Sequence, residues 1–204
     1  MSREEFNESW LGEMPERIGT TELIDMLEYN IKDLIKNGHK PESIGSLQKI
    51  ELASVVYYYQ TDRDGNISIA VAFDKKPNTL VVNSIGKRGN AGKPPFASDL
   101  YIAVLNDRKG SNNSISLTSD ETLSDRGFAI WKRLLQAGHS ISLYDKNAPG
   151  QTHTRINSVK ELTSFFKNDN RDYRRYQYIL SEGDGIEVRA QFLTRRTREL
   201  AGLL

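Results

Sequence analysis

Residues 80–96 read Leu80-Val-Val-Asn-Ser-Ile-Gly-Lys-Arg-Gly-Asn-Ala-Gly-Lys-Pro-Pro-Phe96, an apolar run, a basic glycine-rich turn and a proline pair. The run predicts a strand, and the apolar spacing after the prolines predicts a helix over 96–106. Glycines let a backbone approach a phosphate, and the N–H groups of a first helical turn point at such an anion. The turn Gly86–Lys93 therefore predicts a site for a phosphate-bearing ligand. The alternative is a solvated loop whose glycines only satisfy turn geometry.

The residues before this stretch predict a helix followed by three strands. Thr20–Lys36 carries apolar residues at helical spacing, with threonine as a cap. β-rich runs follow at 52–60 and 67–73, and an Asp-Gly step between them indicates a hairpin. With the run that begins at Leu80, three consecutive antiparallel strands are expected over residues 50–86. Glu51 is expected to open the first of them.

The residues after the turn alternate between strand and helix. The expected elements are a strand at 114–118, a helix at 124–137, a strand at 140–144, a helix at 159–166 and a strand at 173–180. Further helices are expected at 3–11 and 190–204. The pattern predicts an α/β fold (α+β, with a mixed, mostly antiparallel central sheet flanked by helices) in a single domain, 1–204, with N-terminal helices within 1–40.

Composition bounds the class of protein. The chain has 204 residues, a formal net charge of +1 and no cysteine, so bulk charge favours no partner and disulfide or thiolate chemistry is excluded. The three histidines are scattered and predict no metal site. No apolar run approaches the roughly 20 residues of a membrane span, and the polar N-terminus is unlike a signal peptide. A cytoplasmic protein without a membrane partner is expected.

The element order, with a phosphate-type turn between the third strand and its helix, resembles the GNAT superfamily of N-acetyltransferases. In that family the segment after the central strand carries Gln/Arg-x-x-Gly-x-Gly/Ala and cradles the pyrophosphate of acetyl-CoA. The matching stretch is Arg88–Lys93, in which Ala91 and Lys93 depart from the pattern. The resemblance implies acetyl-CoA as cofactor, held by Lys87, Arg88, Gly89, Asn90, Ala91, Gly92 and Lys93.

A second match covers the next strand and helix of the family, at 115–120 and 127–131. The pattern of residues 118–145 (Thr-Ser-Asp, a helix with tryptophan, a glycine and a strand that ends in Tyr-Asp) also resembles small GNAT-like proteins encoded by bacteriophages. That resemblance would place the chain in the host cytoplasm or in a virion.

The resemblance implies an acid, a base and a polarising group. In the family a glutamate near the central strand is often the base, a tyrosine on the later helix is often the acid, and a backbone N–H of the central strand polarises the carbonyl. Here the central strand offers no carboxylate, and the helix position falls at about Trp131, which its apolar stripe assigns to the core. Tyr144 is the substitute acid, and Asp120 or Glu51 the substitute base.

The leading hypothesis is transfer of an acetyl group from acetyl-CoA to a small-molecule or protein amine by direct attack. The alternative is a catalytically inactive protein of the same fold that acts by binding, as a virion component or an inhibitor of a host protein. A third reading, nucleic-acid binding, rests on Arg174, Arg175, Arg195 and Arg196. The favoured alternative for Arg174 and Arg175 is a solvated edge strand guarded by arginine, and for Arg195 and Arg196 the alternative is a solvated helix face.

Overall fold

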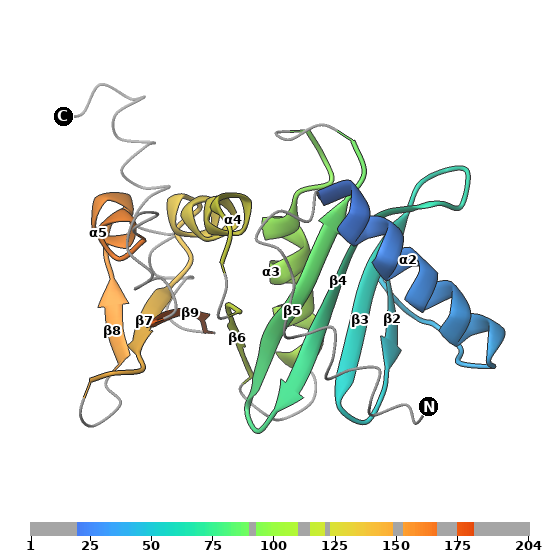
Figure 1. Ribbon diagram of the computed structural model, residues 1–204, viewed down its shortest axis with the longest axis horizontal. Coiled ribbons are helices and arrows are strands. Elements are labelled where there is room, and N and C mark those ends of the chain that lie inside the picture. The colour runs from blue at the N-terminus through green and yellow to red at the C-terminus, as the bar shows by residue number, and fades with distance from the viewer. Residues whose placement is uncertain are drawn as a thin grey trace, which may run out of the picture. The chain divides into compact units, whose positions relative to one another are not determined.

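The chain folds into helices and a mixed sheet (Figure 1). A computed structural model describes residues 20–89, 93–109, 115–120, 123–148, 153–166 and 175–181. In chain order the elements are α2 (Thr20–Lys36), β1 (Glu42–Ile44), β2 (Leu47–Glu51), β3 (Val55–Thr61), β4 (Ile67–Lys76), β5 (Thr79–Lys87), α3 (Ala97–Lys109), β6 (Ser116–Thr118), α4 (Asp125–Gln136), β7 (Ile141–Asp145), β8 (His153–Ile156), α5 (Val159–Ser164) and β9 (Tyr176–Leu180).

The strands form one nine-stranded sheet in the order β1-β2-β3-β4-β5-β6-β9-β7-β8. β5 and β6 pair in parallel, whereas β6 with β9 and β7 with both β8 and β9 pair antiparallel. A parallel pair needs a crossover between its strands, and here α3 lies in the connection. The predicted α/β class with a mixed, mostly antiparallel sheet is confirmed.

Contacts divide the chain into two compact units that share β4 and β5. Unit 1 takes its residues from Met1–Leu52, Val56–Ala72 and Ser84–Pro95, and unit 2 from Ala53–Val55, Phe73–Asn83 and Phe96–Leu204. In unit 1, α2 buries an apolar stripe at helical spacing, formed by Ile24, Leu27, Ile31 and Leu34. In unit 2, the core is rich in rings, with Phe73, Tyr101, Trp131 and Tyr178 buried.

The predicted elements that fall within the described residues exist, most of them with shifted ends. The helix Thr20–Lys36 has the predicted bounds, and Ser124 and Ala137 cap α4 rather than belong to it. Nothing in the described ranges tests the helices expected at 3–11 and 190–204, which lie outside them. None of the helices within those ranges is long and apolar enough to cross a membrane.

Three strands were not predicted from the sequence. β1 and β2 form a hairpin around Gly45, where only Leu47 and Ile50 are buried. β8 lies at the sheet edge with one buried residue, Ile156. Edge strands of this kind arise from pairing with a neighbour and carry little apolar alternation of their own.

Candidate functional site

The parallel pairing of β5 and β6 is short. Thr79, Leu80 and Val81 pair with Ser116, Leu117 and Thr118. Hydroxyl groups reinforce this ladder, because Thr79 Oγ1 lies 2.8 Å from Thr118 Oγ1 and 3.0 Å from Ser116 Oγ. The two strands are thus fastened firmly at the start of β5.

The parallel pairing with β5 ends at Thr118, whereas the pairing with β9, present along β6, continues into residue 119. Ser119 N donates to Tyr178 O at 2.8 Å, and Tyr178 N donates to Ser119 Oγ at 3.0 Å. Gln177 Nε2 donates to Ser119 O at 3.3 Å. β5 meanwhile continues to Lys87. We call the point after Val81 and Thr118, where the parallel pairing ends, the β5–β6 fork.

The backbone alternation of β5 shifts by one residue past the fork. Ser116 N donates to Asn78 O, so the even-numbered residues at the start of β5 direct their backbone N–H and C=O groups toward β6. The parallel ladder follows the same alternation. Arg88 is also even-numbered, yet its N–H donates to Ser68 O on β4 at 2.8 Å. A regular strand presents every second residue to the same neighbour. β5 therefore contains one extra residue between Asn78 and Arg88, as at a β-bulge, a feature that re-aims backbone groups near active sites.

Buried titratable groups lie in unit 2 close to the end of β6. Tyr101 on α3 is 1% exposed, and burial, together with the charge of Asp120, raises the pKa of its phenol. Oδ1 of Asp120 is shielded from solvent. The Tyr101 hydroxyl therefore stays protonated at neutral pH and can donate a hydrogen bond but not take up a proton.

Trp131 lies in the core of unit 2. Its side chain is 1% exposed and its ring lies 6.0 Å from that of Tyr101 and 5.9 Å from that of Tyr178. The assignment of Trp131 to the core is confirmed. The buried indole N–H is not acidic enough to give up a proton, so Trp131 has no part in proton transfer.

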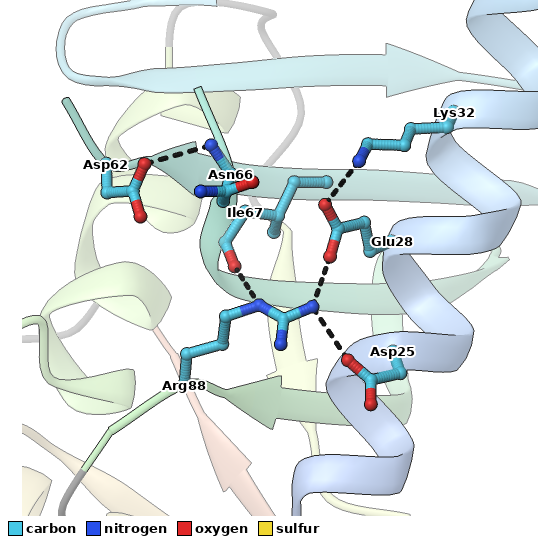
Figure 2. A network of polar contacts seen from close by, with 7 residues as sticks. All are labelled: Asp25, Glu28, Lys32, Asp62, Asn66, Ile67 and Arg88. Atoms are coloured by element: carbon cyan, nitrogen blue, oxygen red, sulfur yellow. Dashed lines mark hydrogen bonds and ion pairs between the residues drawn. The ribbon is translucent and has the colours of Figure 1, made fainter. Parts of the chain in front are cut away.

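Arg88, expected in the pyrophosphate turn, pairs with carboxylates of α2 (Figure 2). Its Nη2 lies 2.7 Å from Asp25 Oδ1 and also binds Glu28, while its Nε donates to Ile67 O at 3.2 Å. Lys32 contacts the other oxygen of Glu28 at 2.7 Å. We call Asp25, Glu28, Lys32 and Arg88 the α2 charge cluster. An anion near Arg88 would have to compete with two carboxylates.

The α2 charge cluster holds Glu28 ionised. Burial by itself disfavours the charged carboxylate, but hydrogen bonds and charges from Lys32 and Arg88 outweigh it and lower the pKa of Glu28. The hydrogen bond to Glu28 raises the pKa of Arg88. The cluster therefore joins α2 to the end of β5 through charged hydrogen bonds.

The rest of the predicted turn has two described contacts. Lys87 Nζ donates to Lys93 O, which closes the turn on itself. Gly89 has φ of +88°, a conformation that favours glycine. Asn90, Ala91 and Gly92 lie outside the described residues.

Gly86 has a packing role that the sequence reading did not assign to it. A Cβ on Gly86 would lie 2.5 Å from Ile24 N, so α2 approaches β5 as closely as a glycine permits.

The other predicted residues divide between the units. Glu51 ends β2 in unit 1, where it pairs with Val56, so the expectation that it opens a strand is wrong. Its place follows from the unpredicted β1–β2 hairpin. In unit 2, β6 and β7 both run antiparallel to β9, so their C-terminal ends share one sheet edge. Asp120 and Tyr144 therefore lie at that edge, where the Tyr144 ring is 5.5 Å from His153.

One of the arginines on which the nucleic-acid hypothesis rests is paired with a carboxylate. Arg175 binds Asp145 in a bidentate pair, with Nε–Oδ1 at 2.7 Å and Nη2–Oδ2 at 2.5 Å. This hydrogen bonding lowers the pKa of Asp145. Arg174, Arg195 and Arg196 lie outside the described residues. Within those residues no group of histidine and carboxylate side chains is arranged to hold a metal ion.

Sequence reasoning missed the α2 carboxylates and Tyr101. Asp25 and Glu28 read as the solvent face of an amphipathic helix, and their partner is about sixty positions away. No protein-family model matches the chain, and no curated protein matches it.

Proposed function

We propose that this chain binds acetyl-CoA and transfers its acetyl group to an amine, as a GNAT-like acetyltransferase. The observation that carries the proposal is the β5–β6 fork. In the GNAT family the pantetheine arm enters where the central strand and the next strand part. A parallel pairing that ends after three residue pairs while β5 continues to the strand-to-helix turn supports that arrangement.

Lys87 and Lys93 are the proposed cationic contacts for the pyrophosphate. They flank the turn, and Lys93 is exposed. Ammonium groups and backbone N–H groups of a glycine turn are the donors that a pyrophosphate accepts. Arg88 has a different part in the proposal: its pair with α2 fixes the end of β5, and its charge is largely balanced there.

The shift of alternation in β5 supports a further element of the proposal. At a bulge one residue falls out of the ladder, which offers a backbone N–H of the central strand to the thioester carbonyl. The amine nitrogen forms the new N–C bond, the C–S bond breaks, and the thiolate takes a proton. Tyr144 is the proposed acid. Asp120 and Glu51 remain the proposed bases, and Asp120 shares a sheet edge with Tyr144.

Calorimetric titration of the full chain with acetyl-CoA tests binding, and release of free thiol in the presence of an amine tests transfer. Lys87→Ala combined with Lys93→Ala is expected to weaken acetyl-CoA binding about tenfold or more, through the loss of two charged contacts. Lys40→Ala, an exposed lysine after α2, is the matched control. No heat at millimolar acetyl-CoA would remove the cofactor from the proposal.

A second candidate is a binding protein of the same architecture without acyl transfer, such as a virion component or an inhibitor of a host protein. It is favoured by the buried Trp131 at the position where the family places its acid. Binding of acetyl-CoA without thiol release, together with a co-purified partner protein, would support this candidate over the first.

A further inference from the structure

A carboxylate on β4 lies beside the central strand. Asp74 accepts hydrogen bonds from Asn83 Nδ2 on β5, at 3.3 Å to each of its oxygens. Asp74 is half-buried and Asn83 is exposed. Sequence reasoning found no carboxylate on the central strand, and this contact places one there from the neighbouring strand.

The Asp74–Asn83 pair lies on the sheet face away from α3. Phe73 packs against Tyr101 of α3, with ring centroids 5.9 Å apart. Successive side chains of a strand point to opposite faces, so Asp74 points away from that helix. Ser54, whose carbonyl accepts from Lys75 N, is also exposed.

The pair is also next to the β5–β6 fork. Val81 is the last residue of β5 in the parallel ladder, and Asn83 follows it two positions later in the same strand. Lys76 lies on the Asp74 face as well, but toward the turn at 77–78 and so farther along β4 from the fork.

The charge of Asp74 is held in place but not neutralised. Glu28 and Asp145 each have a cationic partner. Among the residues that the structure describes, Asp74 forms no ion pair, and an amide such as that of Asn83 carries no charge. An oriented carboxylate without a cation is suited to binding an ammonium group.

We propose that Asp74, oriented by Asn83, binds the acceptor of the transfer reaction, and that the acceptor class is a cationic aliphatic amine. The inference rests on the proposed acetyltransferase function and names its substrate class. The ammonium form binds to Asp74 and then gives up two protons in the overall reaction. One proton ends on the sulfur of coenzyme A as the C–S bond breaks, and the other passes to bulk water as the N–C bond forms.

Thiol release by the full chain, with saturating acetyl-CoA, tests the inference. The acceptors are 1,4-diaminobutane, which is cationic at neutral pH, and aniline, which is neutral. Asp74→Asn is expected to raise the KM for diaminobutane about tenfold or more, with kcat and the affinity for acetyl-CoA little changed. The preference for diaminobutane over aniline should fall by the same factor. Asp74→Glu should retain most of that preference, and Asn83→Ala should give a smaller change in the same direction.

Asp64→Asn, in the exposed β3–β4 turn, is the matched control and should behave as wild type. An equal loss with both acceptors, or an unchanged KM for diaminobutane in Asp74→Asn, would overturn the assignment of Asp74 while acetyl transfer stands. A wild-type chain that neither binds acetyl-CoA nor releases thiol would overturn the proposed function and this inference together. A thermal melt of each variant shows whether it is folded.

Discussion

Each of the two units is stabilised internally by different chemistry. In unit 1, α2 is joined to the end of β5 by the α2 charge cluster, in which Arg88 binds Asp25 and Glu28. In unit 2, helices and strands pack through aromatic rings, and Trp131 of α4 contacts Tyr101 of α3 and Tyr178 of β9. Ring burial stabilises a fold through apolar area, whereas partly exposed ion pairs stabilise it weakly and mainly fix geometry.

The difference indicates what each unit contributes to the proposed reaction. Unit 2 contains the fork, Asp120 and Asp74, and its core is rich in buried rings. Unit 1 contains Arg88 at the end of β5, which is held by ion pairs whose strength depends on pH and salt. The variants below test whether stability follows rings in one unit and charge in the other.

The largest effect is expected from Trp131→Ala. Removing a fully buried indole should lower the free energy of unfolding by about 3–5 kcal/mol, as measured by urea denaturation. Trp131→Phe keeps most of the apolar contact and should cost clearly less. A small loss for the alanine variant would contradict the view that unit 2 depends on its rings.

Gly86→Ala is expected to have the next largest effect. Its new Cβ would meet backbone atoms of Ile24 at 2.5–2.6 Å, which only a shift of α2 can relieve. We expect a loss of about 3 kcal/mol, at the upper end for overpacking. Gly127→Ala is the matched control, because the one close contact of its Cβ is the movable end of Leu123 at 2.7 Å and its other neighbours lie at 3.5 Å. Equal losses for the two variants in denaturation would contradict the close approach of α2.

Replacing Arg88 tests the α2 charge cluster. Arg88→Met leaves Glu28 without one of its cations, and we expect a loss of about 2 kcal/mol because Arg88 is itself partly exposed. Adding Glu28→Gln should recover much of that loss, since the buried charge is then removed as well. Strictly additive losses in this double-mutant cycle would show that the two residues are not coupled.

The smallest expected effect is the decrease in the free energy of unfolding at acid pH that is due to Glu28. The pKa of Glu28 is lowered in the folded chain, so its contribution is complete above the unfolded-state pKa and is lost as pH falls through the folded-state pKa. The pKa of Asp145 is also lowered and acts in the same direction. Comparing wild type with Glu28→Gln between about pH 5 and 3 isolates Glu28. If the free energy of unfolding fell with pH equally in wild type and Glu28→Gln, Glu28 would not contribute to this pH dependence.

The sequence was sufficient where one helix or strand carries its own apolar pattern. α2 and α4 were predicted because their buried residues recur at helical spacing, and Trp131 was assigned to the core for the same reason. Edge strands β1 and β8 form by pairing and have few buried residues, so local pattern did not show them.

The site was less predictable, because its contacts join distant residues. Arg88 was read as a phosphate ligand, and its pairing with Asp25 and Glu28 depends on where α2 packs. The Asp74–Asn83 contact depends on the register between β4 and β5, which the sequence did not specify. Tyr144 and Asp120 share a sheet edge only because β9 lies between β6 and β7.

The division into units has a consequence for how the chain is made. Unit 1 is assembled from Met1–Leu52, Val56–Ala72 and Ser84–Pro95, and the segments between them belong to unit 2. No cut in the chain separates the two units, so neither can be produced as one continuous fragment. During synthesis, unit 1 is complete once residue 95 has emerged, while unit 2 waits for β9 to enter between β6 and β7. A ribosome-bound chain ending shortly after residue 95 would therefore expose to chaperones the parts of β4 and β5 that belong to unit 2, within Phe73–Asn83.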